Sequence, residues 1–494
     1  MSRAVSNLIC LSKGDRFACK TDPITPIVDH LCASRFEHLD EATINAAKKA
    51  VLDTFGAGLA GSSAPMGKMV SRMAVDQGGK ATSTLWVTGN RIPMLEAAFA
   101  NAIMGRCREL DDVHESSPRA SMGHGGHVNV MIVPGALAVL EGLPNPVSGR
   151  DLISAIAAGG DLIPRLRMAA GGSGSIGWEG PTLGPFGVAA AVGKLWKFNS
   201  GKMANAMGAA YAHCAGNILS TSDGTWDVWL NAGVATRAGV LAAELARHGH
   251  QGVHAPLLGS AGLYPLYFRG EYHEEALLSA LGEHFESANV SIKPYASCKG
   301  THHAIQTALE LKEQHMIQAN EIARIVVRTC QYKMQMVVND SARVVKPAPT
   351  STNEAQFSMA FTIAMALVKG SVFADIFSDD ALQGPEILRL FARTDISATP
   401  DKDALQKTEG YPPDDVEIHM KNGAIHTGCA QLVTGHPKRP MNFNEVAAKF
   451  WRCAAMSERT FPDDALEKFI STVRRLEDVA DVRSLIGQLH TALR

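Results

Sequence analysis

The sequence predicts a mainly α-helical fold with a smaller α+β part. Two observations lead to this prediction. Apolar and small residues recur at helical spacing up to about residue 280, whereas residues 281–433 combine β-branched alternating stretches with helical runs. The chain has 494 residues, 46% of them hydrophobic, which is enough for two cores. We therefore expect a large all-helical domain over 24–280, an α+β domain over 281–433, and C-terminal helices over 434–494 that return to the helical domain.

The first part of the chain has the clearest helical pattern. Residues 44–61 place small and apolar side chains at helical spacing and then stop on glycine. Alanine and glycine are frequent there, which predicts helices that pack closely together. Comparable stretches follow at residues 94–104, 152–158, 186–195 and 234–246.

The pattern changes in the second part. Ile322–Thr329 and Asp415–Met420 are β-branched and partly alternating, as expected of half-exposed strands. They bracket helical runs at 302–314 and 354–368. Residues 442–494 turn helical again, and we expect them to pack on the first part.

The balance of charge excludes two classes of partner. Lysine and arginine total 47 and the acidic residues total 49, with no run of like charge. We therefore expect neither a nucleic-acid partner nor binding to a membrane surface. The apolar runs are too short or too interrupted to span a membrane. A small anionic substrate would have to be bound by local cations.

The cysteine pattern indicates the redox state of the compartment in which the protein is expected to function. There are 9, scattered and never spaced as CxxC, which argues against a disulfide framework, a zinc site or an iron–sulfur cluster. We expect no metal and no organic cofactor. A reducing compartment follows, and the cytoplasm is the natural choice. Residues 1–22 resemble a mitochondrial presequence only faintly, which leaves the mitochondrion as the alternative.

Acidic, imidazole and basic side chains gather between two predicted helices. The residues that form this group are Glu109, Asp111, Asp112, Arg119, His124 and His127. A histidine set against carboxylates suits proton transfer near neutral pH, because the carboxylates orient and tune the imidazole. The alternative is a solvated acidic turn with capping residues. The histidines lack helical i,i+4 spacing and a cysteine partner, which argues against a metal site.

Other motifs are weaker. The segment from Lys293 to His302 places lysines and histidines before a predicted helix, which suits a substrate carboxylate or, alternatively, a solvated helix start. Residues 172–177 match GxGxxG but follow no strand, so we do not expect a dinucleotide site, although a substrate-facing loop remains the alternative. From position alone, Arg165, Arg167 and Tyr332 are expected to be structural.

Several segments occur in the order found in a known enzyme family. They are residues 51–61, Glu109–Asp112, His127 with Pro134, residues 259–267, Lys293–Cys298 with His302, and residues 354–359. In this order they resemble the MmgE/PrpD family, which includes 2-methylcitrate dehydratase, fungal alkylcitrate dehydratases and cis-aconitate decarboxylase. The resemblance covers nearly the whole chain. It implies a large helical domain, a smaller α+β domain, a cleft between them, and a homodimer.

The resemblance also implies roles for individual residues. The residues at family site positions are His127 (the catalytic histidine), Glu109 (the first acidic residue), Asp111, Asp112, Lys293, His302 and, near an active-site tyrosine, Tyr332. Two positions depart from the family. A second histidine common in the decarboxylases falls at Trp178, and a family lysine falls at Asp227 or Val228, which weakens a decarboxylase interpretation most.

We therefore expect a hydro-lyase that dehydrates 2-methylcitrate or, in fungal secondary metabolism, a longer 2-alkylcitrate. Removing water needs a base beside a carboxylate, an acid for the departing hydroxyl, and cations for the carboxylates. The expected catalytic residues are His127 for proton transfer, Glu109 or Asp112 as its partner or the second acid/base, and Lys293. The expected substrate-binding residues are Asp111, Arg119, His124, Trp178, His302 and Tyr332.

Three other functions stay open at this point. They are decarboxylation of cis-aconitate, epimerisation of a substituted succinate, and a binding or scaffold role without catalysis. Trp178 is expected to shape an apolar pocket for the alkyl chain, with plain core packing as the alternative. These functions differ in the residues that line the substrate pocket, and no single sequence motif identifies those residues.

Overall fold

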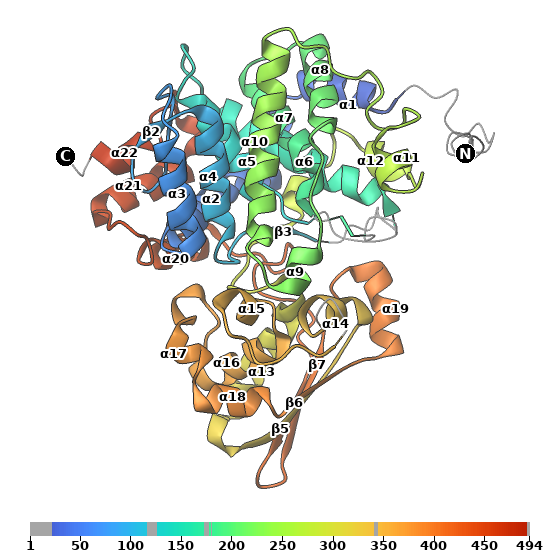
Figure 1. The fold of residues 1–494 in the computed structure, drawn as a ribbon, viewed down its shortest axis with the longest axis vertical. Helices are drawn as coiled ribbons and strands as arrows, with labels where there is room; N and C mark the ends of the chain where they lie inside the picture. Colours follow the sequence, from blue (N-terminus) through green and yellow to red (C-terminus); the bar gives the residue numbers. More distant parts are fainter. Residues whose placement is uncertain (1–21, 116–125, 172–176, 179, 340–343, 492–494) are drawn as a thin grey trace, which may run out of the picture.

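The computed structural model describes residues 22–115, 126–171, 177–178, 180–339 and 344–491 (Figure 1). It confirms the predicted mainly helical fold with a smaller α+β part. In Figure 1 the blue and green helices form one body, the yellow and orange elements form the other, and the red C-terminal helices lie beside the blue ones. The expected domain limits at residues 280 and 433 stay a prediction.

The helical body is built around α5 (Asn129–Leu140), whose every residue is buried. Its other main helices are α1 (Ile24–Ala33), α2 (Glu41–Ser62), α3 (Pro65–Asp76), α4 (Met94–Arg106), α6 (Gly149–Ala169), α7 (Gly184–Leu195), α8 (Ser200–Tyr211) and α10 (Asp227–Arg247). Glycine lets two of them approach closely, because a Cβ on Gly159 of α6 would press on the Gly187 carbonyl oxygen of α7. The stretches predicted from small-residue spacing all lie within these helices.

The α+β part holds a four-stranded sheet. Its order is β6 (Thr394–Ala398), β5 (Ile322–Thr329), β7 (Asp415–Met420), β8 (Ile425–Gly428), with β6 parallel to β5 and the other pairs antiparallel. Both predicted strands are confirmed. The accompanying helices are α13 (His302–Gln314), α14 (Gln331–Val337), α15 (Thr352–Gln356), α16 (Met359–Lys369), α18 (Pro385–Phe391) and α19 (Pro400–Glu409).

One predicted helical run is wrong in detail. Residues 354–368 do not form one helix, because α15 ends at Gln356 and α16 begins at Met359. Ser358 lies between them, and its hydroxyl accepts a hydrogen bond from the Phe361 backbone N–H. A serine that caps the next helix in this way ends the previous one.

The C-terminal helices return to the helical body, as expected. They are α20 (Phe443–Ala454), α21 (Asp463–Arg474) and α22 (Gly487–Thr491), and α20 packs on α2. A buried ion pair joins these two helices, since Lys449 Nζ lies 2.6 Å from Asp53 Oδ1. Lys449 also donates to the Leu110 carbonyl oxygen at 2.7 Å, which ties α20 to the segment that carries the acidic motif.

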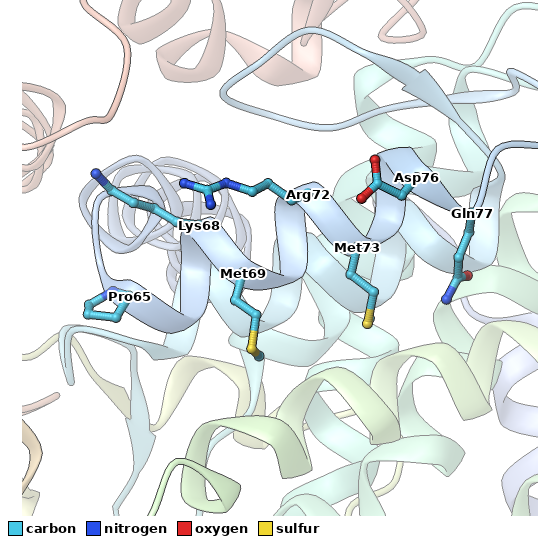
Figure 2. A pocket seen from close by; sticks show the side chains of 7 residues that line it. All are labelled: Pro65, Lys68, Met69, Arg72, Met73, Asp76 and Gln77. Atoms are coloured by element: carbon cyan, nitrogen blue, oxygen red, sulfur yellow. The ribbon is translucent and has the colours of Figure 1, made fainter.

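Helix α3 forms part of the outer surface of the helical body. Figure 2 shows Met69 and Met73 pointing to one side of α3, whereas Lys68 and Arg72 point to the other. Both methionines are exposed, as is Val234 on the neighbouring part of α10. Single exposed apolar residues are common, so these three carry no functional conclusion by themselves.

Candidate active site

Two short strands bring the acidic motif to the cationic segment. Strand β3 (Val113–His114) pairs antiparallel with β4 (Val290–Ser291), which places the residues before β3 next to those after β4. Between α4 and β3 the chain turns sharply, and Glu109 has a φ of 52°, in the left-handed region that non-glycine residues rarely adopt. The acidic residues and Lys293 therefore meet although some 180 positions separate them along the chain.

Four buried charges form the floor of the site. Arg106, in the last turn of α4, binds Glu109 and lies 3.2 Å from Asp111 Oδ1. Lys293 Nζ lies 3.1 Å from Glu109 Oε2 and 3.5 Å from Asp111 Oδ1. Burial would raise the pKa of both carboxyls, but Arg106 and Lys293 outweigh it and hold each pKa below its usual range. Both acids are therefore ionised at neutral pH.

His127 lies on this network with a defined tautomer. Its Nδ1 is 2.6 Å from Asp111 Oδ2 and 3.2 Å from the Asp112 carbonyl oxygen. Its Nε2 is 3.0 Å from Arg106 Nη2. Both neighbours of Nδ1 can only accept and the neighbour of Nε2 can only donate, so the proton is on Nδ1 and the lone pair on Nε2. Burial and Arg106 lower the pKa of His127, which keeps the imidazole neutral at pH 7.

The two adjacent aspartates do not have the expected parts. The carboxylate of Asp112 accepts hydrogen bonds from the Asn129 and Val130 backbone N–H groups and from the Asn129 side chain, at 2.8–3.3 Å. It caps the start of α5. Asp112 was expected as the partner of His127 or as the second acid/base; the carboxylate nearest His127 is that of Asp111, and a role of Asp112 as second acid/base stays a prediction. Burial raises the pKa of Asp112 to about 7.

A cavity opens beside His127, between the helical body and the α+β part. Its polar lining residues are Arg106, Glu109, His127, Arg167, Thr221, Lys299, Tyr332 and Tyr411. Its apolar lining residues include Val113, Trp178, Ile218, Met336 and Phe357. Concave sites with an apolar wall and a few converging polar groups are typical of small-molecule binding. Among the sequence-predicted residues, Glu109, His127, Trp178 and Tyr332 are brought together here.

The remaining predicted residues lie elsewhere. Arg119 and His124 lie outside the described residues. Lys293 is fully buried beneath Glu109 and Asp111 and does not line the cavity. His302 is also fully buried, with Nε2 3.1 Å from the Ser297 carbonyl oxygen, and burial lowers the pKa of His302 well below its usual value. His302 does not line the cavity, and its expected role in binding substrate stays a prediction.

Comparison with known proteins identifies the family of the chain. A model described as the MmgE/PrpD N-terminal domain matches residues 25–276, and one described as the MmgE/PrpD C-terminal domain matches residues 295–478. The chain belongs to the MmgE/PrpD family. The resemblance predicted from the order of the motifs is thereby confirmed.

Several relatives in the MmgE/PrpD family align with most of the chain. Human cis-aconitate decarboxylase is 24% identical over 467 residues, which cover 90% of this chain and 89% of the relative. Cis-aconitate decarboxylase of Aspergillus terreus is 25% identical and covers 81% and 82%. A cis-aconitate decarboxylase-like protein of Aspergillus oryzae is also 25% identical and covers 89% and 92%. Decarboxylases are lyases, so lyase chemistry belongs to the family.

The residues that depart from the MmgE/PrpD pattern are Trp178 and Asp227 or Val228. The Trp178 ring lines the cavity and packs on Tyr267 with centroids 4.6 Å apart, and its indole N–H donates to the Tyr267 carbonyl oxygen at 3.0 Å. Val228 is buried in α10 and Asp227 is exposed at its first turn. None of the three offers a basic side chain to the cavity.

Sequence reasoning missed several residues of the site. Arg106, the cation at the centre of the site, was not predicted. Its i,i+3 spacing to Glu109 is the sequence signal that could have identified it. Arg167 was expected to be structural by position, yet it lines the cavity. Arg165 is structural as expected, since it is buried and binds Asp161 and four backbone carbonyl oxygens.

Two features are absent from the described residues. No helix in them is long and apolar enough to cross a membrane. No group of three or more histidine, cysteine or acidic side chains in them is arranged to hold a metal ion.

Proposed function

We propose that the chain is a hydro-lyase that removes water from 2-methylcitrate or a longer 2-alkylcitrate. The observation that carries this proposal is the neutral His127, which lines the cavity with its proton on Nδ1 and with an Nε2 lone pair that accepts from Arg106 Nη2 until substrate takes over that donor. In the proposed step Nε2 takes a proton from the carbon beside a substrate carboxylate. The electron pair of that C–H bond forms the carbon–carbon double bond, and the hydroxyl of the neighbouring carbon leaves as water.

The departing hydroxyl needs a proton donor. Glu109 is a poor one, because its pKa is held low and it is already ionised. Tyr332 is a better one. It lines the cavity, and burial raises its pKa to about 12 against the opposing effect of Arg167, so it stays protonated at neutral pH. We assign Tyr332 as the proton donor and His127 as the base.

The apolar wall supports an alkylated substrate. Trp178, Ile218, Met336 and Phe357 line one cavity with the polar group, and such side chains favour a hydrocarbon substituent over a further charge. Burying a few methylene groups there would contribute about 0.8 kcal/mol for each group. The length of the alkyl chain is left to experiment.

Decarboxylation of cis-aconitate is the second candidate, because the relatives named above carry that activity in their names. Loss of CO₂ leaves a carbanion that needs a proton from an acid. His127 is neutral in the free enzyme and its lowered pKa favours accepting a proton from substrate over storing one. This chemistry, together with Trp178 at the cavity wall, supports dehydration over decarboxylation.

The test is turnover by the purified chain. It is incubated with 2-methylcitrate, a longer 2-alkylcitrate and cis-aconitate, and the products are identified by mass spectrometry. Loss of one water from either citrate is the expected result, and loss of CO₂ from cis-aconitate alone would replace the proposal with the second candidate. Inversion at a substrate carbon without mass change would indicate an epimerase, and no reaction at all would indicate a binding protein.

A variant pair tests the role of His127. His127→Ala should abolish turnover while circular dichroism shows the helical fold retained, although the melting temperature should fall because Asp111 and Arg106 each lose one partner. Near-normal activity in this variant would remove His127 from the mechanism. His250→Ala is a matched control, because that histidine is exposed at the end of α10.

Two further expectations belong to this proposal. We expect a homodimer, which light scattering during gel filtration would measure. We also expect a cytoplasmic location, supported by the scattered cysteines, with the mitochondrion as the alternative; imaging of the tagged full chain would decide between them.

A further inference from the structure

One cation of the cavity differs from the others in its partners. Arg106 is paired with Glu109 and Asp111, and Lys299 Nζ lies 2.5 Å from Glu115 Oε1. Arg167, in the last turn of α6, lines the same cavity. Within the described residues it forms no ion pair, and its Nη1 is buried without a hydrogen-bond partner.

Two tyrosines lie among the described residues around Arg167. The described groups that influence the pKa of Arg167 are the phenols of Tyr332 and Tyr411, whose ring centroids lie 6.1 Å apart. Burial raises the pKa of Tyr411 far above its usual range, so this phenol, like Tyr332, is uncharged at neutral pH. A hydrogen bond from Tyr411 lowers the pKa of Tyr332, which means that Tyr411 donates and Tyr332 accepts.

Arg167 is half-buried, and the described residues give its buried Nη1 no hydrogen-bond partner. Burial lowers the pKa of Arg167, yet arginine stays protonated at any physiological pH. A buried ion without a partner is costly, and an anion that enters the cavity removes that cost. Carboxylates match the guanidinium best, because two parallel N–H groups can bind both oxygens. The cavity thus has a place for one carboxylate at Arg167.

We propose that Arg167 binds the substrate carboxylate attached to the hydroxyl-bearing carbon. This assignment rests on the proposed function and deepens it. In a 2-alkylcitrate the leaving hydroxyl and one carboxylate share a carbon atom. Because Arg167 and Tyr332 are neighbours, binding that carboxylate at the guanidinium places the hydroxyl near the phenol that protonates it.

The opposite end of the reaction is a separate group of residues. His127 contacts Asp111 and Arg106, whereas Tyr332 and Tyr411 line the cavity together with Arg167. Proton removal and hydroxyl departure are therefore served by two clusters in one cavity. A substrate that lacks the central carboxylate would leave Arg167 without a partner, so Arg167 sets specificity for hydroxy-tricarboxylates over dicarboxylates.

Two unreactive ligands isolate this contact. Tricarballylate carries the three carboxylates of citrate but no hydroxyl, and glutarate is the same chain without the central carboxylate. Calorimetry gives the dissociation constant of each ligand for the wild type, Arg167→Met and Arg167→Lys. Arg150→Met is the matched control, because Arg150 lies at the opposite end of α6 with its side chain 54% exposed.

The expected result is a difference between the two ligands. Arg167→Met should weaken tricarballylate binding by about 10- to 150-fold, the range for losing a hydrogen bond to a charged group. It should leave the weaker binding of glutarate unchanged. Arg167→Lys should lie between, because it keeps the charge but not the paired N–H groups. The control should bind both ligands as the wild type does.

Other outcomes overturn the assignment. Equal weakening of both ligands by Arg167→Met, no weakening at all, or a wild type that binds neither ligand would each do so. Melting curves show whether the variants are folded, and Arg167→Lys supplies the comparison if Arg167→Met is not. Failure of the proposed function looks different: a wild type that binds tricarballylate through Arg167 but dehydrates no tricarboxylate would keep the binding site and remove the hydro-lyase.

Discussion

The adjacent aspartates allow one substitution to be made in two environments. Asp111→Asn removes the carboxylate that lies 2.6 Å from His127 Nδ1 and also contacts Arg106 and Lys293. Asp112→Asn changes the cap of α5, whose carboxyl has its pKa raised to about 7 by burial. The raised pKa means that this carboxyl gives up its negative charge more easily than an ordinary aspartate, and asparagine has nearly the same shape.

The structure sets the size of each effect. When His127 takes a proton it becomes positive, and the Asp111 charge stabilises it. Removing a charged hydrogen-bond partner costs about 1.5–3 kcal/mol, which lowers kcat by about 10- to 150-fold. The loss should not be larger, because the Asp112 carbonyl oxygen still accepts from Nδ1 and keeps the tautomer. Asp112→Asn should change kcat by less than about tenfold, the equivalent of 1.4 kcal/mol.

The assay is steady-state turnover of the active substrate at pH 6, with melting curves for both variants. Asp111→Asn should also melt lower, because buried Arg106 and Lys293 each lose one of two carboxylate partners. The reverse result would refute the argument: a large loss of kcat in Asp112→Asn with near-normal kcat in Asp111→Asn would mean that the second aspartate serves the chemistry.

Three more predictions follow from the same structure. The kcat/KM of the wild type should stay level as pH falls to 6.5 and decline only below it, because the pKa of His127 is lowered and only neutral imidazole accepts a proton; a decline that starts near pH 7.5 would contradict this. Trp178→Ala should lower kcat/KM for 2-methylcitrate by about tenfold or more through lost apolar contact, and an equal activity with all chain lengths would remove Trp178 from specificity. Gly149→Ala should lower the melting temperature, since a Cβ there would overlap the Leu476 carbonyl oxygen, whereas Gly487→Ala, which meets open space, should not.

Much of the fold follows from residue patterns that act locally. The alternation in Ile322–Thr329 and Asp415–Met420 predicted β5 and β7 with the bounds that the structure shows. Helix α13 also matches the predicted run at 302–314. The break at Ser358 was not predicted, because one serine within an apolar run is compatible with a continuous helix. Only the capping hydrogen bond in the structure shows that the helix ends there.

The site was predictable only in part, for reasons of geometry. The order of residues shows that acidic side chains and histidines lie close to His127 along the chain. It does not show which of two adjacent aspartates contacts the imidazole. Which of them faces the imidazole depends on the turn at Glu109, whose φ is 52°. Glutamate has no preference for left-handed backbone conformations, so the sequence does not predict this turn. The burial of His302 was not predicted for a related reason, since a helix start on the cavity side and one on the core side have the same residue pattern.

The distribution of charge explains how a histidine with a lowered pKa can serve as a base. Around His127 the cations Arg106 and Lys293 are matched by Glu109 and Asp111, so the floor of the site carries no net charge before substrate binds. A polycarboxylate brings several negative charges into this enclosed space. Nearby anions favour the protonated form of an imidazole and raise its pKa. Substrate itself therefore strengthens the base at the moment of proton transfer, whereas in the empty enzyme the same residues keep His127 neutral and ready to accept.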